Sequence, residues 1–160
     1  MGFKNISCQV KIKRIHPDAR FPKYEHPGDS GADLYALEEF ILPPLERKII
    51  PTGLCAEVPP GFELQVRPKS GLALSHGLTV LNTPGTIDAG YRGEIKVILI
   101  NLGQDTYRVK IGQKIAQLVV TPVVTACFQE VDEVSESERG AGGFGSTGLF
   151  EVRGSRFDNS

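Results

Sequence analysis

Residues 82–101 read NTPGTIDAGYRGEIKVILIN, and this stretch predicts a tight hairpin that leads into a long strand. Pro84-Gly85 marks a first turn and DAG a second, because glycine accepts backbone angles that other residues resist. Beyond the turns, the stretch runs into an alternating strand. The hairpin places an amide (Asn82), a carboxylate (Asp88) and a phenol ring (Tyr91) on a loop held by a sheet, as in many small sites. The same residues also fit a purely structural hairpin in which the carboxylate only serves the turn.

Length and composition favour a single β-rich domain. The chain has 160 residues, enough for one domain with a sizeable core. Its hydrophobic content of 40% and net charge of -1 exclude a disordered chain and a strongly basic nucleic-acid binder, so we expect no nucleic-acid partner. The 18 glycines and 11 prolines are spread along the length, which favours many short strands over long helices.

The cysteines give no sign of a disulfide framework or a structural zinc site. Cys8, Cys55 and Cys127 are far apart in the sequence and form no CxxC pair, and the three histidines are equally scattered. No charged-then-apolar leader opens the chain, and no apolar run reaches the roughly 18 residues of a membrane span. We therefore expect a cytoplasmic protein without a membrane partner.

Several further segments show the alternation of strands. Predicted strands run from Cys8 to Ile15 and from Phe62 to Val66, and two more lie between Arg47 and Val58. The segment from Tyr107 to Val124 predicts a strand, a turn at Gly112 and then a long apolar strand.

Two acids cluster with glycines in GDSGADLYA, residues 28–36. Carboxylate oxygens suit a hard cation such as Mg²⁺, bound directly or through its waters. The alternative is a turn closed by side-chain-to-backbone hydrogen bonds. For Asp29 the turn is the better interpretation, whereas for Asp33, which precedes the strand-like Leu34-Tyr35, both interpretations stay open.

A short helix with phosphate-binding character is predicted in RPKSGLALSHGL, residues 67–78. Ser70 after a proline is a good N-cap, and the residues from Gly71 to Ser75 suffice for one or two helical turns. A cation at Lys69 beside free backbone N–H groups suits phosphate oxygens, although an ordinary capped helix fits the pattern as well. In the later stretch GQKIAQLV, Gln117 is the one residue expected to face a site, because its apolar neighbours are most simply core.

The glycine-rich stretch RGAGGFGSTG, residues 139–148, predicts a flap that closes over a ligand. Its GAGGFG formally matches the dinucleotide fingerprint GxGxxG, but an acidic stretch precedes it and no βαβ unit follows. Glycines let the backbone wrap an anion, Arg139 adds charge, two hydroxyls follow, and Phe144 brings a ring able to stack on a base. A tail without any function is the alternative.

The stretches GDSGADLYA, RPKSGLA, NTPGTIDAGYRGEI, GQKIAQLV and RGAGGFGSTG closely resemble, in order and spacing, the five motifs of the trimeric dUTPases. The resemblance runs from about Gly28 to Gly148. It implies an all-β, jelly-roll-like fold with one short helix and a flexible glycine-rich C-terminal arm. The β-rich domain would span residues 1–130, and the arm, residues 131–160, would close over a neighbouring subunit's active site.

The activity that the resemblance implies is hydrolysis of dUTP to dUMP and pyrophosphate by a Mg²⁺-dependent homotrimer. This reaction would limit uracil incorporation into DNA and supply dUMP for thymidylate synthesis. By the same resemblance, Asp88 activates the water that attacks the α-phosphorus. Tyr91 packs on the deoxyribose and excludes a 2′-hydroxyl, while Asn82, with nearby backbone, reads the uracil edge.

The resemblance also assigns the phosphate side. Ser70, with the backbone of Gly71, faces the leaving pyrophosphate, and Gln117 orders phosphate or water. Asp33 acts on Mg²⁺ through bound waters. The catalytic residues implied are Asp88, Ser70 and Gln117. The substrate-binding residues implied are Lys69, Ser70, Gly71, Asn82, Gly85, Thr86, Ile87, Asp88, Tyr91, Gln117, Arg139, Phe144, Gly145, Ser146 and Thr147.

One motif departs from the family pattern, because the usual Arg-Ser-Gly is here Lys69-Ser70-Gly71. Lysine keeps the charge but loses the bidentate fork of arginine. We therefore expect retained activity with an altered grip on phosphate, for which Arg67 is a candidate to compensate. The segment after Gly148 matches no motif.

Two other functions fit a chain with these motifs. A dCTP deaminase of related fold would attack the base, but the DAGY hairpin and the complete flap with its phenylalanine favour a triphosphatase. A non-catalytic regulatory module would bind nucleotide and signal to a partner. Such a module does not need both the catalytic aspartate and the flap. A structural β-trimer without a ligand would leave the polar groups of five motifs unexplained.

Overall fold

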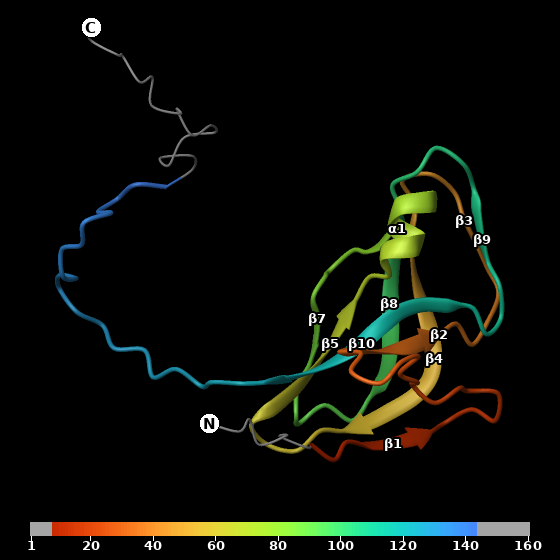
Figure 1. Ribbon diagram of the computed structural model, residues 1–160, viewed down its shortest axis with the longest axis horizontal. Coiled ribbons are helices and arrows are strands. Elements are labelled where there is room, and N and C mark those ends of the chain that lie inside the picture. Colours follow the sequence, from red (N-terminus) through yellow and green to blue (C-terminus); the bar gives the residue numbers. More distant parts are fainter. Residues whose placement is uncertain (1–7, 144–160) are drawn as a thin grey trace, which may run out of the picture. The chain divides into compact units, whose positions relative to one another are not determined.

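The computed structural model describes residues 8–143, and the chain divides into two units, Met1–Thr125 and Ala126–Ser160 (Figure 1). All helices and strands of the described residues lie in the first unit. The strands are β1 Lys11–Arg14, β2 Gly31–Tyr35, β3 Phe40–Leu42, β4 Arg47–Glu57, β5 Phe62–Arg67, β6 Leu78–Val80, β7 Gly85–Ile87, β8 Glu94–Asn101, β9 Tyr107–Val109 and β10 Lys114–Pro122, and the one helix is α1 Ser70–His76.

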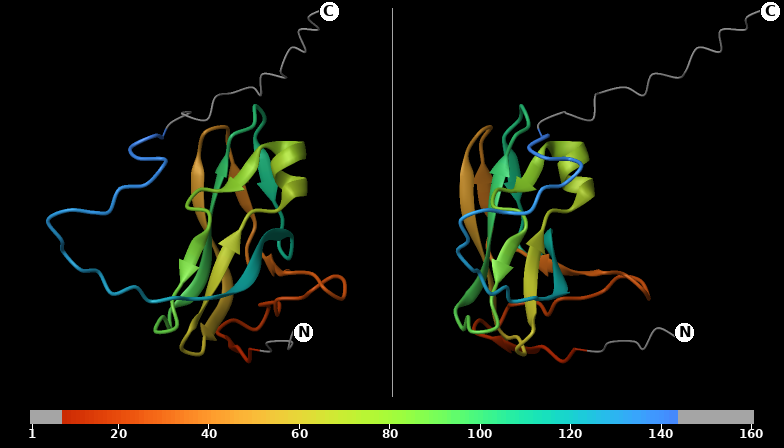
Figure 2. Two further views of the ribbon diagram at one scale, coloured as in Figure 1. Left: turned by 60° about the vertical axis from the view of Figure 1, so that its left-hand side comes forward. Right: turned by 90° about the vertical axis from the view of Figure 1, so that its left-hand side faces the viewer.

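The strands form three antiparallel sheets. One four-stranded sheet has the order β1-β4-β8-β6, and a second has the order β2-β10-β5-β7. The third is the pair β3-β9. The two four-stranded sheets pack face to face, because one cluster of buried side chains joins Ile50 and Val97 of the first sheet to Leu34, Leu64 and Leu118 of the second (Figure 2). The all-β fold with one short helix that the sequence predicts is confirmed.

The alternation of β8 is the clearest link from sequence to packing. Ile95, Val97 and Leu99 are at most 1% exposed, while the residues between them face outward or are half-buried. Asn101 continues the buried series although it is polar. Its Nδ2 donates to the carbonyls of Leu42 and Asp105, at 2.9 and 2.8 Å, so the buried amide is satisfied.

Two strand predictions differ from the structure. The segment from Arg47 is one strand, β4, of 11 residues, not two. Its ladder with β8 shifts register between Pro51 and Cys55, since proline has no N–H to donate, and the chain bends there without breaking. The predicted N-terminal strand is also shorter, because β1 covers only Lys11–Arg14. The predicted turn at Gly112 is confirmed, with a φ of 70° that favours glycine.

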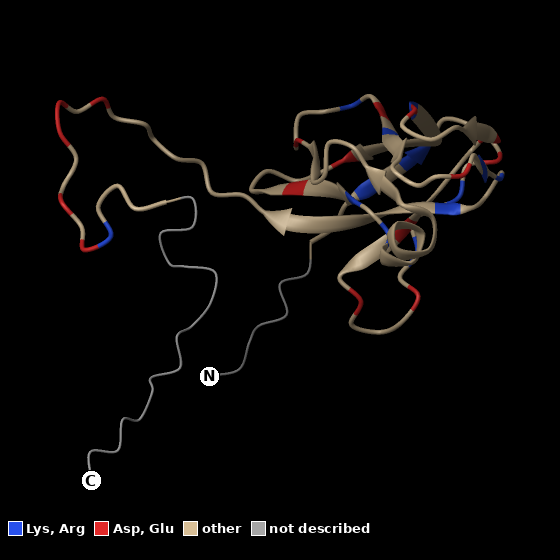
Figure 3. Cartoon of the chain, turned by 90° about the horizontal axis from the view of Figure 1, so that it is seen from above, with Lys and Arg blue, Asp and Glu red and all other residues tan. Residues whose placement is uncertain are grey.

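The described part of the second unit, residues 126–143, contains neither helix nor strand. It carries the stretch EVDEVSESE, whose aspartate and glutamates are red in Figure 3, and then Arg139. Arg139 donates from Nε to the carbonyl of Gly142, at 2.8 Å, and Gly142 N–H donates back to the carbonyl of Arg139, at 3.1 Å. The predicted boundary at residue 130 and the flap residues Phe144, Gly145, Ser146 and Thr147 stay predictions, the last four because they lie outside the described residues.

Candidate active site

The second sheet brings residues of three predicted motifs into one row. Asp33 on β2 lies opposite Gln117 on β10, and Gln117 lies opposite Arg67 on β5. Side chains directly opposite one another share a face of the sheet. The Nε2 of Gln117 donates to the carbonyl of Pro68, at 2.9 Å, which ties the row to the turn before α1. Gly31 makes room for this amide, because a Cβ there would stand 2.1 Å from Oε1 of Gln117.

A β-bulge in β10 adds a residue to this face. Gln117 lies opposite Asp33, and Ala116 lies opposite Leu34, but the register then shifts so that Lys114 lies opposite Tyr35. Residues three apart in a regular strand point to opposite faces, and the extra residue of a bulge corrects this offset. Lys114 therefore shares the face of Asp33 and Gln117. The cavity at this place has a volume of about 310 Å³. It is lined by Glu25, Asp29, Ser30, Gly31, Asp33, Lys69, Lys114 and Gln117; we call it the phosphate-side cavity.

Asp33 is the buried charge of the phosphate-side cavity, with a side chain 6% exposed. Lys69 donates to its Oδ1, and Lys114 donates to its Oδ2, at 2.7 Å. Lys114 also binds Oε2 of Glu25, at 2.8 Å. Burial raises the pKa of Asp33, but the hydrogen bonds and charges of Lys114 and Lys69 outweigh it, so the pKa lies below the ordinary aspartate value. The pKa of Lys114 is raised by Asp33 and then by Glu25.

This arrangement limits what Asp33 can do for a metal ion. Both carboxylate oxygens are engaged by ammonium groups, so neither is open to bind Mg²⁺ directly. Within residues 8–143, no group of three His, Cys, Asp or Glu side chains is placed to hold a metal. The residues that the structure describes thus do not build a metal centre here, and the contact of Asp33 with Mg²⁺ through water stays a prediction. The neighbouring Asp29 closes a turn, as predicted, because its Oδ2 accepts from the N–H of His26 at 2.9 Å.

The start of the helix and its N-cap each lie one residue earlier in the chain than predicted. Lys69, with an extended backbone, is the N-cap of α1, and its carbonyl accepts from the N–H of Ala73 at 3.0 Å. Ser70, predicted as the N-cap, is the first helical residue, so its exposed hydroxyl caps nothing. Arg67, the candidate to compensate for Lys69, instead donates from Nε and Nη2 to Oε1 of Gln65, at 2.9 and 2.5 Å.

The predicted hairpin begins on the same sheet. Gly85 of β7 lies opposite Val66 of β5, and Ile87 lies opposite Leu64. The amide of Asn82 lies beside Gly85, since a Cβ on Gly85 would stand 3.2 Å from its Nδ2. Gly85 and Ile87 are buried, so Thr86 between them faces outward.

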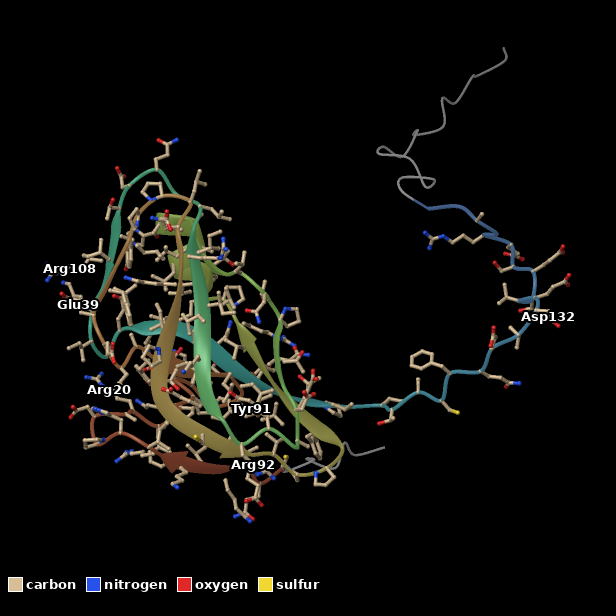
Figure 4. All side chains as sticks on the ribbon, turned by 180° about the vertical axis from the view of Figure 1, so that it is seen from behind. Arg20, Glu39, Tyr91, Arg92, Arg108 and Asp132 are labelled. Atoms are coloured by element: carbon tan, nitrogen blue, oxygen red, sulfur yellow. The ribbon has the colours of Figure 1, made fainter. Side chains whose placement is uncertain are left out.

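The tip of the hairpin is held by its own backbone. Tyr91 N–H donates to the carbonyl of Asp88, at 3.0 Å, and closes the turn. The hydroxyl of Tyr91 donates to the carbonyl of Glu94, at 3.1 Å, and its ring is 45% exposed. Arg92 donates from Nη1 to the carbonyls of Ala89 and Tyr91, at 2.6 and 2.8 Å (Figure 4). The exposed carboxylate of Asp88 lines a cavity of about 380 Å³ beside residues 60–63.

Within one chain the predicted site residues fall into two groups. On β5, Leu64 lies opposite Ile87 and thus next to Asp88, whereas Arg67 lies in the row of Gln117. These positions are three residues apart on the strand, or about 10 Å at roughly 3.3 Å per residue. Asp88 and Gln117 also line different cavities. One described unit therefore does not gather the three predicted catalytic residues at one point.

The buried charge of Asp33 predicts a specific response to acid. A carboxylate whose pKa is lowered by folding contributes stability above its unfolded pKa of about 3.9, and this contribution is lost as the pH falls toward the folded pKa. We expect the free energy of unfolding in urea, measured without metal, to fall more steeply below about pH 5 in the native chain than in Asp33→Asn. Glu39→Gln, which removes an exposed partner of Arg108 (Figure 4), should change this slope less because solvent screens that pair. Equal slopes for the native chain and Asp33→Asn would contradict the assignment.

Comparison with known proteins decides the family. The family model dUTPase matches residues 18–148. The chain belongs to the dUTPase family. The deoxyuridine 5'-triphosphate nucleotidohydrolase of Clostridioides difficile is 56% identical over 140 residues, which cover 88% of this chain and 98% of that protein. The corresponding protein of Clostridium kluyveri is 55% identical over 140 residues, with the same two shares.

Solved structures of dUTPases share the fold. A mutant dUTPase of Staphylococcus bacteriophage 80alpha with dUpNHpp has a TM-score of 0.79 and 29% identity, and the match covers 88% of this chain and 99% of that one. A mutant dUTPase of phage phi11 of S. aureus, described with a structural Mg(II) ion, has a TM-score of 0.73, 25% identity and shares of 78% and 97%. The predicted dUTPase fold is confirmed. In the part of this dUTPase that the structure describes, no helix is long and apolar enough to cross a bilayer.

Among the charged residues that line the phosphate-side cavity, Lys114 and Glu25 were not singled out by the sequence. Lys114 was hidden because the bulge is not visible in the alternation of KIAQLVV. Glu25 lies in a loop that is joined to β2 by one bridge, Lys23 opposite Asp33. No periodic pattern marks a loop residue, and only the fold brings its carboxylate to Lys114.

Proposed function

We propose that this dUTPase hydrolyses dUTP to dUMP and pyrophosphate, as its relatives are named for doing. The observation that carries the proposal is the hairpin, in which the amide of Asn82, the carboxylate of Asp88 and the ring of Tyr91 lie in loops next to strands β7 and β8, which are anchored to the core. All three side chains are exposed, so they are available to a ligand.

The hairpin would select the nucleoside. The amide of Asn82, with the backbone of Gly85, Thr86 and Ile87, offers donors and acceptors for the edge of uracil. The ring of Tyr91 would pack on the deoxyribose, and its hydroxyl is held by the carbonyl of Glu94, which fixes the ring's place. A ring fixed there would leave no room for a 2′-hydroxyl, so dUTP would be preferred to UTP.

Asp88 is the general base of the proposed reaction. A carboxylate within hydrogen-bond reach of a water takes its proton while the oxygen attacks the α-phosphorus. The bond from the α-phosphorus to the bridging oxygen breaks, and pyrophosphate leaves. Apart from this proton transfer, most of the rate gain would come from positioning of the substrate and neutralisation of its charge.

Lys69, Ser70, Gly71 and Gln117 would take the phosphates. The ammonium group of Lys69 brings charge, the hydroxyl of Ser70 and the N–H of Gly71 bring donors, and Gln117 is oriented by Pro68. Magnesium stays in the proposal as an ion carried by the triphosphate, because Mg²⁺ is commonly bound through substrate phosphates and waters. It would neutralise charge on the phosphate oxygens. Asp33 would touch it only through water.

The site is proposed to be completed in a homotrimer. The separation of Asp88 from Gln117 within one chain supports this, because another copy can bring a phosphate-side group to the hairpin. The arm, residues 131–160, would close on the ligand with Arg139, Phe144, Gly145, Ser146 and Thr147 and exclude water. The β-rich domain of residues 1–130 would fold without it. The cytoplasmic location stays a prediction.

The function is tested by pyrophosphate release from dUTP, UTP, dTTP and dCTP with Mg²⁺, with ammonia measured on dCTP. We expect rapid release from dUTP and at least about 10²-fold less from the others, as a site built around specific polar contacts rejects analogues strongly. Ammonia from dCTP would identify a deaminase instead. Tight dUTP binding without product would identify a regulatory module.

A further inference from the structure

The single negative charge of Asp33 has two ammonium counter-ions. The buried carboxylate binds Lys69 through Oδ1 and Lys114 through Oδ2, at 2.7 Å for the latter. Glu25 binds the same ammonium of Lys114, at 2.8 Å. The four side chains carry two negative and two positive charges, so the group is neutral without any ligand.

Lys69 and Lys114 differ in what they can reach. Lys69 stands between the end of β5 and α1, directly before Ser70, on a flexible four-carbon stem. Lys114 stands on the bulge of β10, between the carboxylates of Asp33 and Glu25. A move of Lys69 toward a phosphate would break only one contact with Asp33. A move of Lys114 would break contacts with two carboxylates.

Burial makes the second lysine necessary. A carboxylate only 6% exposed that loses its sole counter-ion is left as an uncompensated buried charge, which is strongly destabilising. A single lysine on Asp33 would therefore be held there and would resist release to a ligand. With Lys114 also in place, the carboxylate keeps a partner when Lys69 leaves.

We propose that Lys114 is a positioning residue that retains Asp33 and thereby frees Lys69 to bind a phosphate of the substrate. This rests on the proposed function and deepens it, since it assigns the phosphate grip to an exchange of partners. Lys69 binds Asp33 in the absence of ligand and the triphosphate in its presence. Glu25 holds Lys114 in place from the loop side, and its exposed carboxylate contributes less because solvent screens it.

Lys114→Gln tests this exchange, with binding of dUMP and of an imido analogue of dUTP measured beside kcat and KM. We expect the analogue to bind about 10-fold more weakly and KM for dUTP to rise similarly, while dUMP binding changes less than about twofold, since Lys69 would serve the outer phosphates. Lys114→Arg, which keeps the charge on Asp33, should restore native values. Arg108→Gln, which removes a surface cation paired with Glu39, should behave like the native chain. Thermal melting shows that each variant is folded.

A double-mutant cycle separates the exchange from a direct contact of Lys114 with phosphate. If Lys114 acts through Lys69, Lys114→Gln has no further effect on triphosphate binding in a Lys69→Gln background. Additive losses, equal losses for dUMP and the analogue, or failure of Lys114→Arg to restore binding would overturn the proposal. A native chain that releases no pyrophosphate from dUTP would overturn the proposed function. The exchange itself fails if the native chain is active and Lys114→Gln matches Arg108→Gln.

Discussion

Asp88→Asn is expected to reduce dUTP turnover by about 10²- to 10⁴-fold, the usual contribution of a positioned general base. The amide has nearly the shape of the carboxylate but does not take the proton of the attacking water. Asp88 is exposed, and the turn is closed by its backbone carbonyl and Tyr91 N–H, so the substitution leaves the hairpin intact. Binding of the imido analogue of dUTP should therefore change little.

The measurement is kcat for pyrophosphate release together with the Kd of the imido analogue. Asp18→Asn is a matched control, because Asp18 is an exposed aspartate, with a side chain 77% exposed, in the loop after β1. It should keep native kcat and Kd. Native turnover in Asp88→Asn would remove Asp88 from the role of base. A loss of analogue binding as large as the loss of turnover would make Asp88 a ligand contact instead.

Strands, turns and helices that depend on residues close together in the sequence could be predicted from the sequence. The alternation at the end of residues 82–101 predicted β8, because burial of every second residue is a property of the strand itself. The turn at Asp29 was predicted because aspartate side chains tend to accept hydrogen bonds from nearby backbone N–H groups. The structure shows such a bond, from the N–H of His26 to Asp29. The helix after Pro68 was also found, although its cap moved from Ser70 to Lys69.

Contacts between residues far apart in the sequence could not be predicted in this way. The bulge in β10 depends on how this strand meets β2, and it alone turns Lys114 to the face of Asp33. Glu25 reaches Lys114 across 89 positions of sequence. A motif-based interpretation of Asp33 as an acid for Mg²⁺ therefore could not foresee two ammonium groups on its oxygens. The family resemblance pointed to Asp33 as a site residue, whereas its contacts with Lys69 and Lys114 are visible only in the structure.

Truncation of the arm before Arg139 is expected to abolish most of the activity while leaving the fold intact. A chain ending at residue 138 keeps every residue of the hydrophobic core that the structure describes, since the buried cluster lies between Ala19 and Leu118. Of the residues removed, the structure describes 139–143, and these contribute neither helix nor strand, so we expect thermal melting and oligomeric state to match those of the full chain. Turnover of dUTP should fall by about 10²-fold or more, because positioning and exclusion of water are lost. An unfolded product would show that the tail stabilises the fold.

Mixing the two inactive variants tests whether one subunit's arm serves another's hairpin. The chain ending at residue 138 keeps Asp88 but lacks the part of the arm from Arg139 on, whereas full-length Asp88→Asn keeps the whole arm but has no general base. If both are co-expressed with different tags and mixed trimers are isolated, an arm that crosses between subunits completes some sites and restores part of the native kcat. An arm that closes on its own subunit's hairpin completes none, and the mixture stays inactive. Mixed trimers in which Arg108→Gln replaces Asp88→Asn provide the reference for full rescue, since that subunit keeps both hairpin and arm.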